Sequence, residues 1–260
     1  MELTVGYYPQ MMALVIARVA AVMMGLNYLG GDGLPAQIKA MMCFVLALAM
    51  LYVLPPNWIT VVSAINTMPA MFMALLNELI IGMAIGAICG MFISACIIAG
   101  AIIGFSNSLS MAQSIDPVSG GSSVITGQCL KMVFVMIVFL MDGHLVLVQL
   151  LAKSFETVPL GSFVWDSQWS YHLVAMGALM YEWGMKLAIP VLTAALIVDA
   201  CMGLISKLAP DFDILFLSLP VRLFVGIAAF GLLIRYGGHI FDSMVRDMFS
   251  KMGGLLAVNS

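Results

Sequence analysis

The stretch that decides the fold reads MPAMFMALLNELIIGMAIGAICGMFISACIIAGAII at Met68–Ile103 and continues as GFSNSLSMAQSIDPVSGGSS at Gly104–Ser123. The first part is the longest apolar run of the chain, and it leads directly into the most polar loop. Seven serines, an Asp-Pro pair and a Gly-Gly pair cannot continue as a lipid-facing helix, because their polar groups would be left unsatisfied in hydrocarbon. We therefore expect a long helix that ends in a loop at or near membrane depth.

Small residues recur every four positions within this run, and a glutamate precedes them at the same spacing. The series consists of Glu78, Gly82, Gly86, Gly90 and Ser94. At about 3.6 residues per turn, this spacing places the series along one slowly drifting stripe of the helix. A helix face without side chains allows another helix to approach closely. We therefore predict a helix-packing stripe on which Gly86→Leu blocks assembly, whereas Gly161→Leu, outside the stripe, does not block it.

The composition is that of an integral membrane protein. Hydrophobic residues make up 63% of the 260 residues and charged residues 9%, whereas soluble domains have about 45–50% and about 25%. The net charge of −3 is spread along the chain without a basic stripe, which argues against a nucleic-acid partner. The five cysteines form no C-x-x-C pair, so neither a disulfide framework nor a metal or cofactor site is expected.

Apolar runs of membrane length recur along the chain, which predicts an all-α polytopic membrane protein with about six long apolar helices, some of them broken. The runs cover Met11–Leu29, Ile38–Leu54, Met68–Ile103, Leu130–Ala152, His172–Ser206 and Ile214–Arg235, and an amphipathic tail covers His239–Ser260. The third run has 36 residues, too many for one span at about 1.5 Å per residue. It is therefore steeply tilted, bent back at its glycines, or not wholly in lipid. The few loop lysines leave the orientation in the membrane open.

Charged residues interrupt these runs, and each would cost about 2.5–3.5 kcal/mol at a lipid-facing helix centre. They are Arg18, Glu78, Lys131, Asp142, Glu182, Lys186, Asp199 and Arg222. Glu182 and Lys186 are spaced i, i+4 and can pair on one helix. Five others have no evident partner nearby in this chain, so we expect them to contact other subunits: Arg18, Glu78, Lys131, Asp199 and Arg222. Near Asp142, His144 indicates either a proton relay or a break between two half-helices, and we favour the break.

Three classes of function fit a chain of this kind. A proton- or ion-coupled small-molecule carrier would use broken helices and buried carboxylates, but no inverted repeat is evident. An intramembrane enzyme is least favoured, because zinc, serine and aspartyl motifs are absent and no catalytic residue can be assigned. A subunit of a larger helical assembly accounts for the glycine stripe, the overlong third run and the charges in the apolar runs.

Short motifs distributed over the whole chain resemble one family, the FliR/SctT proteins of flagellar and injectisome-type (type III) export gates. They are Arg18, Leu34-Pro35-x-x-Ile38-Lys39, Glu78-x-x-Ile81-Gly82-x-x-x-Gly86, Ala99-Gly100, Ser110-x-Ala112-x-x-x-Asp116-Pro117, Gly143-His144, Ser154-Phe155, Pro159-x-Gly161, Ala209-Pro210 and Pro220. Each is weak alone, and the order and spacing are specific. Ala101 departs from the family pattern, where an acidic residue is frequent. The 161–170 linker and the tail resemble the flagellar branch.

The resemblance implies a FliP-like unit at residues 1–175 followed by a FliQ-like helical hairpin and tail at 176–260. It implies one copy joined to five FliP and four FliQ subunits, with FlhB docked outside and exported flagellar proteins as substrates. The place would be the bacterial inner membrane, within the flagellar basal body, and no catalytic role is expected. In this family the 105–123 loop resembles a plug across the closed pore. The plug residues here would be Phe105, Ser106, Asn107, Leu109, Met111, Ile115, Asp116 and Pro117.

Overall fold

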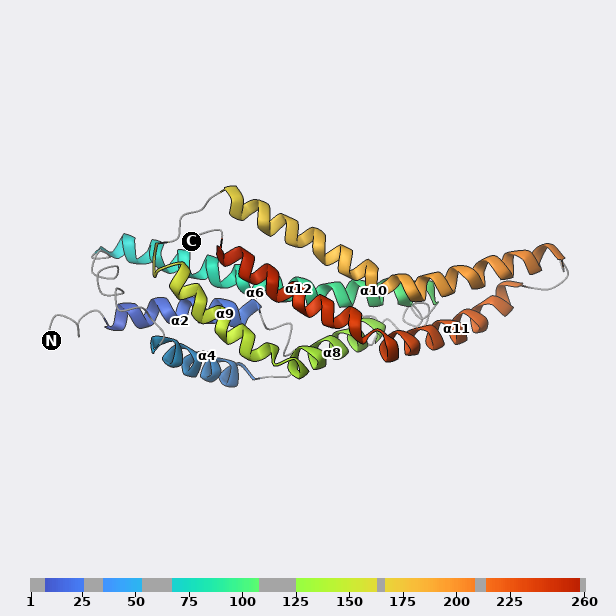
Figure 1. Ribbon diagram of the computed structural model, residues 1–260, viewed down its shortest axis with the longest axis horizontal. Helices are drawn as coiled ribbons and strands as arrows, with labels where there is room; N and C mark the ends of the chain where they lie inside the picture. The colour runs from blue at the N-terminus through green and yellow to red at the C-terminus, as the bar shows by residue number, and fades with distance from the viewer. Residues whose placement is uncertain are drawn as a thin grey trace. The chain divides into compact units, whose positions relative to one another are not determined.

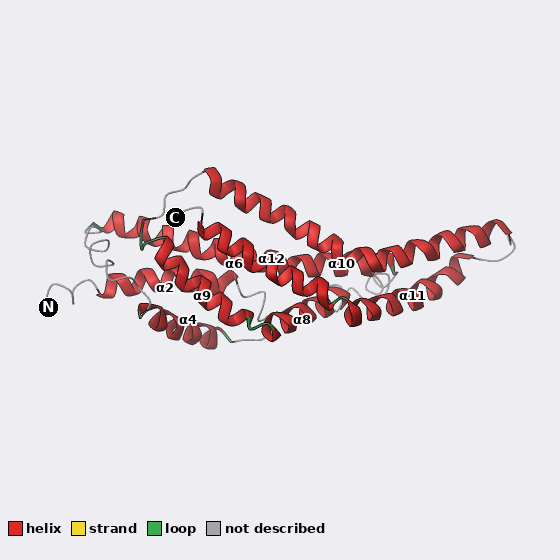
Figure 2. Cartoon of the chain, in the orientation of Figure 1, coloured by secondary structure: helices red, strands yellow, loops and turns green. Residues whose placement is uncertain are grey.

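The structure is a computed structural model that describes residues 8–25, 35–52, 67–107, 125–162, 167–208 and 214–257. Within these ranges the regular structure is helical, without a β-strand (Figure 2). The helices are α2 (Tyr8–Gly25), α4 (Ala36–Leu51), α6 (Met68–Ser106), α8 (Ile125–Leu140), α9 (Gly143–Thr157), α10 (Ser167–Leu208), α11 (Ile214–Tyr236) and α12 (Gly238–Ala257) (Figure 1). The predicted all-α membrane fold is confirmed.

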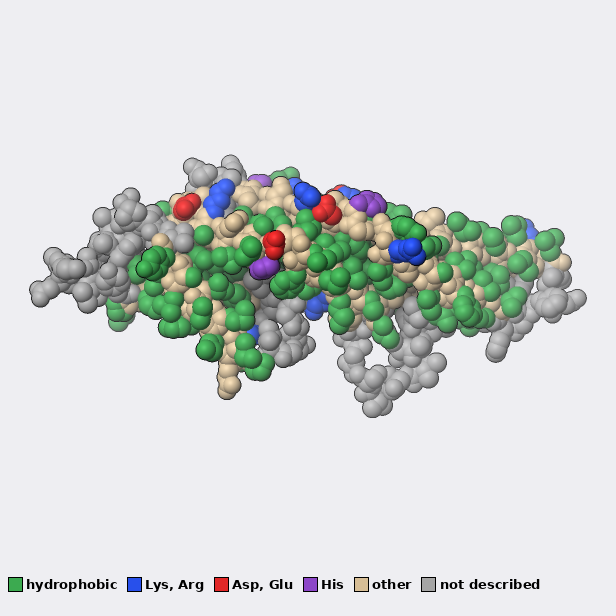
Figure 3. Space-filling view, turned by 60° about the horizontal axis from the view of Figure 1, so that its bottom comes forward, with side chains coloured by type: hydrophobic (Ala, Val, Ile, Leu, Met, Phe, Trp, Pro, Cys, Tyr) green, Lys and Arg blue, Asp and Glu red, His purple; other side chains and the backbone are tan. Residues whose placement is uncertain are grey.

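Among the residues that the structure describes, three helical segments are long and apolar enough to cross a membrane. They are Met68–Ser106, Val174–Leu208 and Leu217–Tyr236. The pair α8 and α9 adds a fourth if it is counted as one broken span, and α2 and α4 are shorter apolar helices. Apolar side chains cover most of the face drawn in Figure 3, on which charged side chains are few.

The overlong third run is one continuous helix. Helix α6 has 39 residues and is not bent back on itself at its glycines. It also continues past Gly104, where we expected the loop to begin. The reason is local, because the Ser106 hydroxyl and the Asn107 N–H both donate to the carbonyl of Ile103, each at 3.0 Å. These two bonds satisfy a carbonyl at the helix end, and the polar residues therefore extend the helix.

The predicted break near His144 is confirmed. Helices α8 and α9 are separated at Asp142, which has a left-handed φ of 53°. The Asp142 carbonyl then accepts the N–H groups of Leu145 at 2.9 Å and Val146 at 3.3 Å, which begins α9.

The chain packs as two compact units, each built from separate stretches of sequence. The first unit contains residues 1–91, 142–177 and 246–260, and the second contains 92–141 and 178–245. These packing units have other bounds than the expected FliP-like and FliQ-like parts. The division at residues 175 and 176 stays a prediction about likeness to other subunits.

The first unit has a core of aliphatic, aromatic and methionine side chains from α2, α6, α9 and α12. Fully or almost fully buried are Leu14, Val15, Ile81, Ile85, Phe155, Met248, Met252 and Leu255. The Cys89 sulfur lies 3.7 Å from the Met252 sulfur, which ties α6 to the end of α12. The buried residues of α12 recur every three or four positions, as expected for an amphipathic helix.

The second unit is held by close contacts between helix backbones. A Cβ on Gly100 of α6 would overlap the backbone of Gly127 on α8, so the two helices touch there without side chains between them. The buried Thr126 hydroxyl donates to the Gly100 carbonyl at 2.6 Å. Gly184 of α10 lies close to α6, because its Cβ would stand 3.2 Å from the Ala95 carbonyl oxygen.

Candidate functional site

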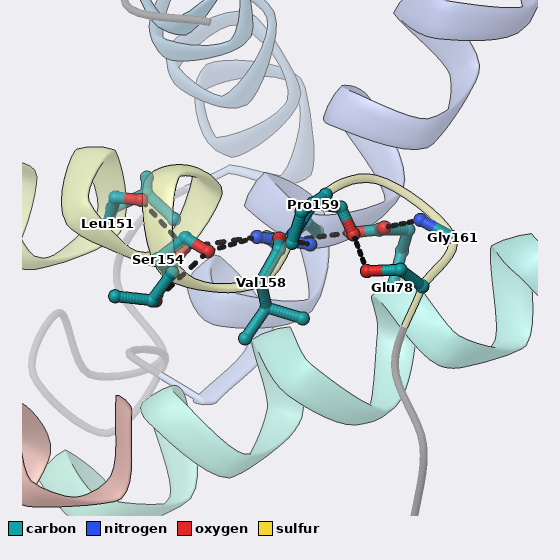
Figure 4. A network of polar contacts seen from close by, with 9 residues as sticks. Glu78, Leu151, Ser154, Val158, Pro159 and Gly161 are labelled. Carbon is teal, nitrogen blue, oxygen red and sulfur yellow. Dashed lines mark hydrogen bonds and ion pairs between the residues drawn. The ribbon is translucent and has the colours of Figure 1, made fainter. Parts of the chain in front are cut away.

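A buried ion pair joins α2 to α6 in the first unit (Figure 4). The Nε–H of Arg18 donates to Oε2 of Glu78, and both side chains are fully buried. Isolated charges at such a position would be costly, since the desolvation penalty is several kcal/mol per ion. The pair is therefore tolerable only if the remaining donors and acceptors also find partners.

The remaining donors of Arg18 bind the end of α9 and the turn after it. Nη1 donates to the Ser154 carbonyl at 2.8 Å and approaches the Ser154 hydroxyl at 3.3 Å. Nη2 donates to the Val158 carbonyl at 3.0 Å. The guanidinium also lies 4.3 Å from the centre of the Phe155 ring. One arginine thereby connects α2, α6 and α9.

The second oxygen of Glu78 holds the turn that follows α9. Oε1 accepts the main-chain N–H of Gly161 at 2.8 Å (Figure 4). Gly161 has a φ of 72°, a conformation that L side chains rarely adopt. A side chain at Gly161 would therefore strain the turn that binds Glu78, a cost that our expectation for Gly161→Leu did not include, and the effect of Gly161→Leu on assembly stays a prediction.

The expectation that the buried charges lack partners in their own chain is wrong for four of them. Arg18 pairs with Glu78, and Asp199 of α10 pairs with Arg222 of α11 at 2.5 Å. The partners are 60 and 23 residues apart in sequence, so neighbouring residues did not reveal them. Lys131 is half-buried on α8, and a role in subunit contacts stays a prediction for all five charges.

The predicted packing stripe lies against α2 at two of its positions. A Cβ on Gly82 would overlap the Arg18 carbonyl oxygen and stand 2.6 Å from Cβ of Ala21. A Cβ on Gly86 would stand 2.8 Å from both Cα of Gly25 and the Val22 carbonyl oxygen. Gly25, which sequence reasoning did not single out, supplies the facing small residue.

The other two stripe residues lie further along α6, where Gly90 is buried and Ser94 half-buried. Whether the stripe also serves contacts with partner subunits stays a prediction.

The predicted plug residues are described only in part. Phe105 and Ser106 belong to the last turn of α6 and not to a loop, and Phe105 is 74% exposed. Asn107 directly follows α6 and is fully buried. The other predicted plug residues lie outside the described part of the chain: Leu109, Met111, Ile115, Asp116 and Pro117.

The side chain of Asn107 packs directly against Gly226 of α11 in the second unit. A Cβ on Gly226 would overlap the amide group of Asn107, so a larger residue at position 226 would displace this side chain. Among the described residues the Asn107 amide oxygen and nitrogen have no hydrogen-bond partner. A buried polar group without a partner costs about 1–3 kcal/mol, which marks the end of α6 as a less stable point of the fold.

Sequence comparison places this arrangement in a known family. The model of the family described as "Bacterial export proteins, family 1" matches residues 10–248. The chain belongs to this family. The match covers α2 through most of α12 and therefore includes the buried network, the stripe and the hairpin of α10 and α11. It confirms the family resemblance carried by the sequence motifs.

Curated relatives align with nearly the whole chain. The chain is 29% identical over 237 residues to the flagellar biosynthetic protein FliR of Caulobacter vibrioides, covering 91% of this chain and 93% of that protein. It is 26% identical over 242 residues to the protein of the same name from Escherichia coli K12, covering 93% and 91%. The Bacillus subtilis protein of that name is 26% identical over 189 residues, covering 70% and 71%.

Proposed function

We propose that this chain is a structural, pore-forming subunit of the flagellar type III protein export gate. The observation that carries the proposal is the family match over residues 10–248, together with relatives named as flagellar biosynthetic proteins that align over more than 90% of both chains. The family match reaches from α2 into α12, so the proposal concerns nearly the whole chain.

In this proposal one copy assembles with five FliP and four FliQ subunits in the bacterial inner membrane, within the flagellar basal body. FlhB binds outside, and exported flagellar proteins are the substrates. Helices α4, α10 and α11 carry large apolar side chains that are exposed in the single chain, which supports a surrounding of partner subunits or lipid. These side chains are Met41, Phe44, Val45, Ile189, Leu196, Ile197, Phe224, Ile227 and Leu232. Soluble proteins rarely expose large apolar patches to water.

A central loop closes the pore in the same proposal. Its predicted chemistry suits a plug, because serines keep the backbone hydrated while Phe105, Leu109, Met111 and Ile115 seal against apolar walls. The exposed side chain of Phe105 at the end of α6 is compatible with this role.

The proposal is tested by expressing the tagged chain with its genomic neighbours and purifying it in mild detergent. We expect FliP- and FliQ-like subunits to co-purify in fixed ratio, and their absence, with a monodisperse and protease-resistant single chain, would contradict the assembly. A small-molecule carrier, by contrast, would be stable alone and would need no such neighbours.

The plug is tested by deleting Ser108–Gln113. The complex should assemble but leak, so that cells take up small ions or dyes that they normally exclude. A variant that assembles, exports normally and shows no leak would reduce the segment to a linker.

A further inference from the structure

A tight turn follows α9 and leads toward α10. The Ser162 N–H donates to the Pro159 carbonyl at 3.2 Å, and the Ser162 hydroxyl donates to the same carbonyl at 2.8 Å. The bond from the fourth N–H to the first carbonyl defines residues 159–162 as a β-turn, with Leu160 and Gly161 at its two central positions. The sequence motif Pro159-x-Gly161 therefore forms this turn.

The turn belongs to type II. Gly161 has a φ of 72°, whereas Asp142 is the one non-glycine residue with a positive φ in the described ranges, so the φ of Leu160 is negative. A negative φ followed by a φ of about +80° is the type II pattern, whereas type I has a φ of about −90° at the second central residue. Conversion of one type into the other rotates the peptide between Leu160 and Gly161 by about 150–170°.

Glu78 distinguishes the two orientations of this peptide. Its Oε1 accepts the Gly161 N–H at 2.8 Å (Figure 4). A trans peptide carries its N–H and C=O on opposite sides, so in a type I turn the Leu160 carbonyl oxygen would replace the N–H in front of the carboxylate. Two acceptors would then face each other in a buried place, since Glu78 is fully buried and Leu160 is 3% exposed. The carboxylate therefore favours the type II turn.

Arg18 holds the carboxylate in place relative to the turn. It donates to Oε2 of Glu78 through Nε and to the carbonyls of Ser154 and Val158 through its two terminal NH2 groups. Both carbonyls belong to the end of α9, directly before the turn. A cation at the carboxyl end of a helix is favourable, and a guanidinium offers its donors in a rigid fork. The end of α9 thus fixes Arg18, and Arg18 fixes Glu78.

The turn also limits where α10 begins. Five Cα–Cα steps separate Ser162 from Ser167, the first residue of α10, and they reach at most about 18 Å. Trp169, in the first turn of α10, is fully buried within the same compact unit. A turn that sent the chain in another direction would pull Trp169 out of this core.

We propose that the Arg18–Glu78 pair is a conformational selector, which holds the Leu160–Gly161 peptide in the type II orientation and thereby sets the path from α9 to α10. Neutralisation of charge alone would not require a carboxylate that faces an N–H and a guanidinium that faces carbonyls, whereas this role requires both. Arg18 and Glu78 are thus positioning residues, and the inference does not depend on which subunits the chain binds.

Glu78→Gln tests the proposal, because it should reverse the preference of the turn. The amide oxygen of the new side chain stays on the charged Arg18 donor, since charge-assisted hydrogen bonds are stronger, and its NH2 group faces the peptide. An NH2 group there favours a type I turn, in which it donates to the Leu160 carbonyl. Gly161→Ala is disfavoured in type II and tolerated in type I. It should therefore be harmful in the parent chain and neutral or beneficial in the Glu78→Gln chain.

The readout is tryptic cleavage after Lys153 of α9, measured by mass spectrometry relative to cleavage after Lys207 in the last turn of α10. The full chain is used, purified in mild detergent with the subunits that accompany it. Gly161→Ala should raise this ratio by about fivefold or more in the parent chain, and should leave it unchanged or lower it in the Glu78→Gln chain. Gly177→Ala is the matched control, because a Cβ there would meet no atom within 4 Å, and its effect should be equal in both chains. An equal rise with Gly161→Ala in both chains would overturn the proposal.

Hydrogen exchange of the unmodified chain gives a measurement that needs no substitution. The N–H of the second central residue has no acceptor within a type II turn, so it exchanges rapidly unless another group binds it. We expect the Gly161 N–H to exchange about 100-fold or more slowly than in an unstructured peptide, because the buried Glu78 accepts it. Free exchange of this N–H would overturn the proposal even if the Glu78→Gln chain does not fold.

Discussion

Removing one member of the Arg18–Glu78 pair should destabilise the first unit far more than a typical substitution. Glu78→Leu leaves the Arg18 guanidinium buried beside two carbonyls and a hydroxyl but without a counter-charge, which costs about 3–5 kcal/mol. Arg18→Leu leaves Glu78 buried and also removes the donor to the Val158 carbonyl, at about 1–3 kcal/mol, whereas the Ser154 carbonyl still accepts the Val158 N–H at 3.1 Å. It should therefore cost at least as much.

The double variant R18L/E78L separates pairing from simple packing loss. It leaves the Val158 carbonyl without its donor but contains no buried charge, so its cost should not exceed that of Arg18→Leu alone. The coupling free energy would then be about 3 kcal/mol or more. The assay is SDS titration of the co-expressed complex in dodecyl maltoside, which compares the midpoint at which this chain unfolds in the single variants, the double variant and the parent.

The exposed ion pair of Glu182 and Lys186 serves as a reference for this double-mutant cycle. Glu182 and Lys186 are about half-exposed, and their coupling should be only about 0.3–0.5 kcal/mol. If the costs of Arg18→Leu and Glu78→Leu add to that of the double variant within about 0.5 kcal/mol, the two side chains do not form the buried unit described here.

Other perturbations follow from single contacts. Gly86→Ala should lower recovery of folded protein severalfold, because its Cβ would stand 2.8 Å from backbone atoms of α2, whereas Gly203→Ala, in open space, should leave recovery unchanged or raise it; equal losses would contradict the close approach. Thr126→Val should destabilise the second unit by about 1 kcal/mol, because the buried hydroxyl bond to Gly100 is lost, and an unchanged SDS midpoint would exclude that bond. Gly226→Ala should displace Asn107 and increase proteolysis after α6, and N107A/G226A should reverse the effect; increased cleavage that persists in the double variant would refute this contact.

Hydrophobic periodicity and run length predicted the helices well, because lipid leaves a chain few alternatives to hydrogen-bonding within a helix. The predicted runs, the break near His144 and the hairpin with its amphipathic tail all appear in the structure. The exact end of α6 was missed by a turn, since it depends on two hydrogen bonds to one carbonyl.

The ion pairs were named residue by residue but not matched with one another. The hairpin pair could have been predicted, because Asp199 and Arg222 lie at nearly equal distances from the connection between α10 and α11. The Arg18–Glu78 pair had a weaker signal, the glycine stripe behind Glu78 that brings α2 close. The carbonyl groups of Ser154 and Val158 had none, because every residue carries a carbonyl and only the folded end of α9 brings these two to Arg18.

Helix α6 packs against other helices at three of the glycines where it could otherwise bend. Pro69 lies in its first turn, and no proline interrupts the 37 residues that follow in the helix. Three of its glycines, where a helix could bend, are pressed against other backbones: Gly82, Gly86 and Gly100. A helix constrained in this way can shift as a whole or fray at its end, but it has little freedom to hinge. Any motion that releases Asn107 from Gly226 should therefore begin as fraying of the last turn of α6 and not as a bend along its length.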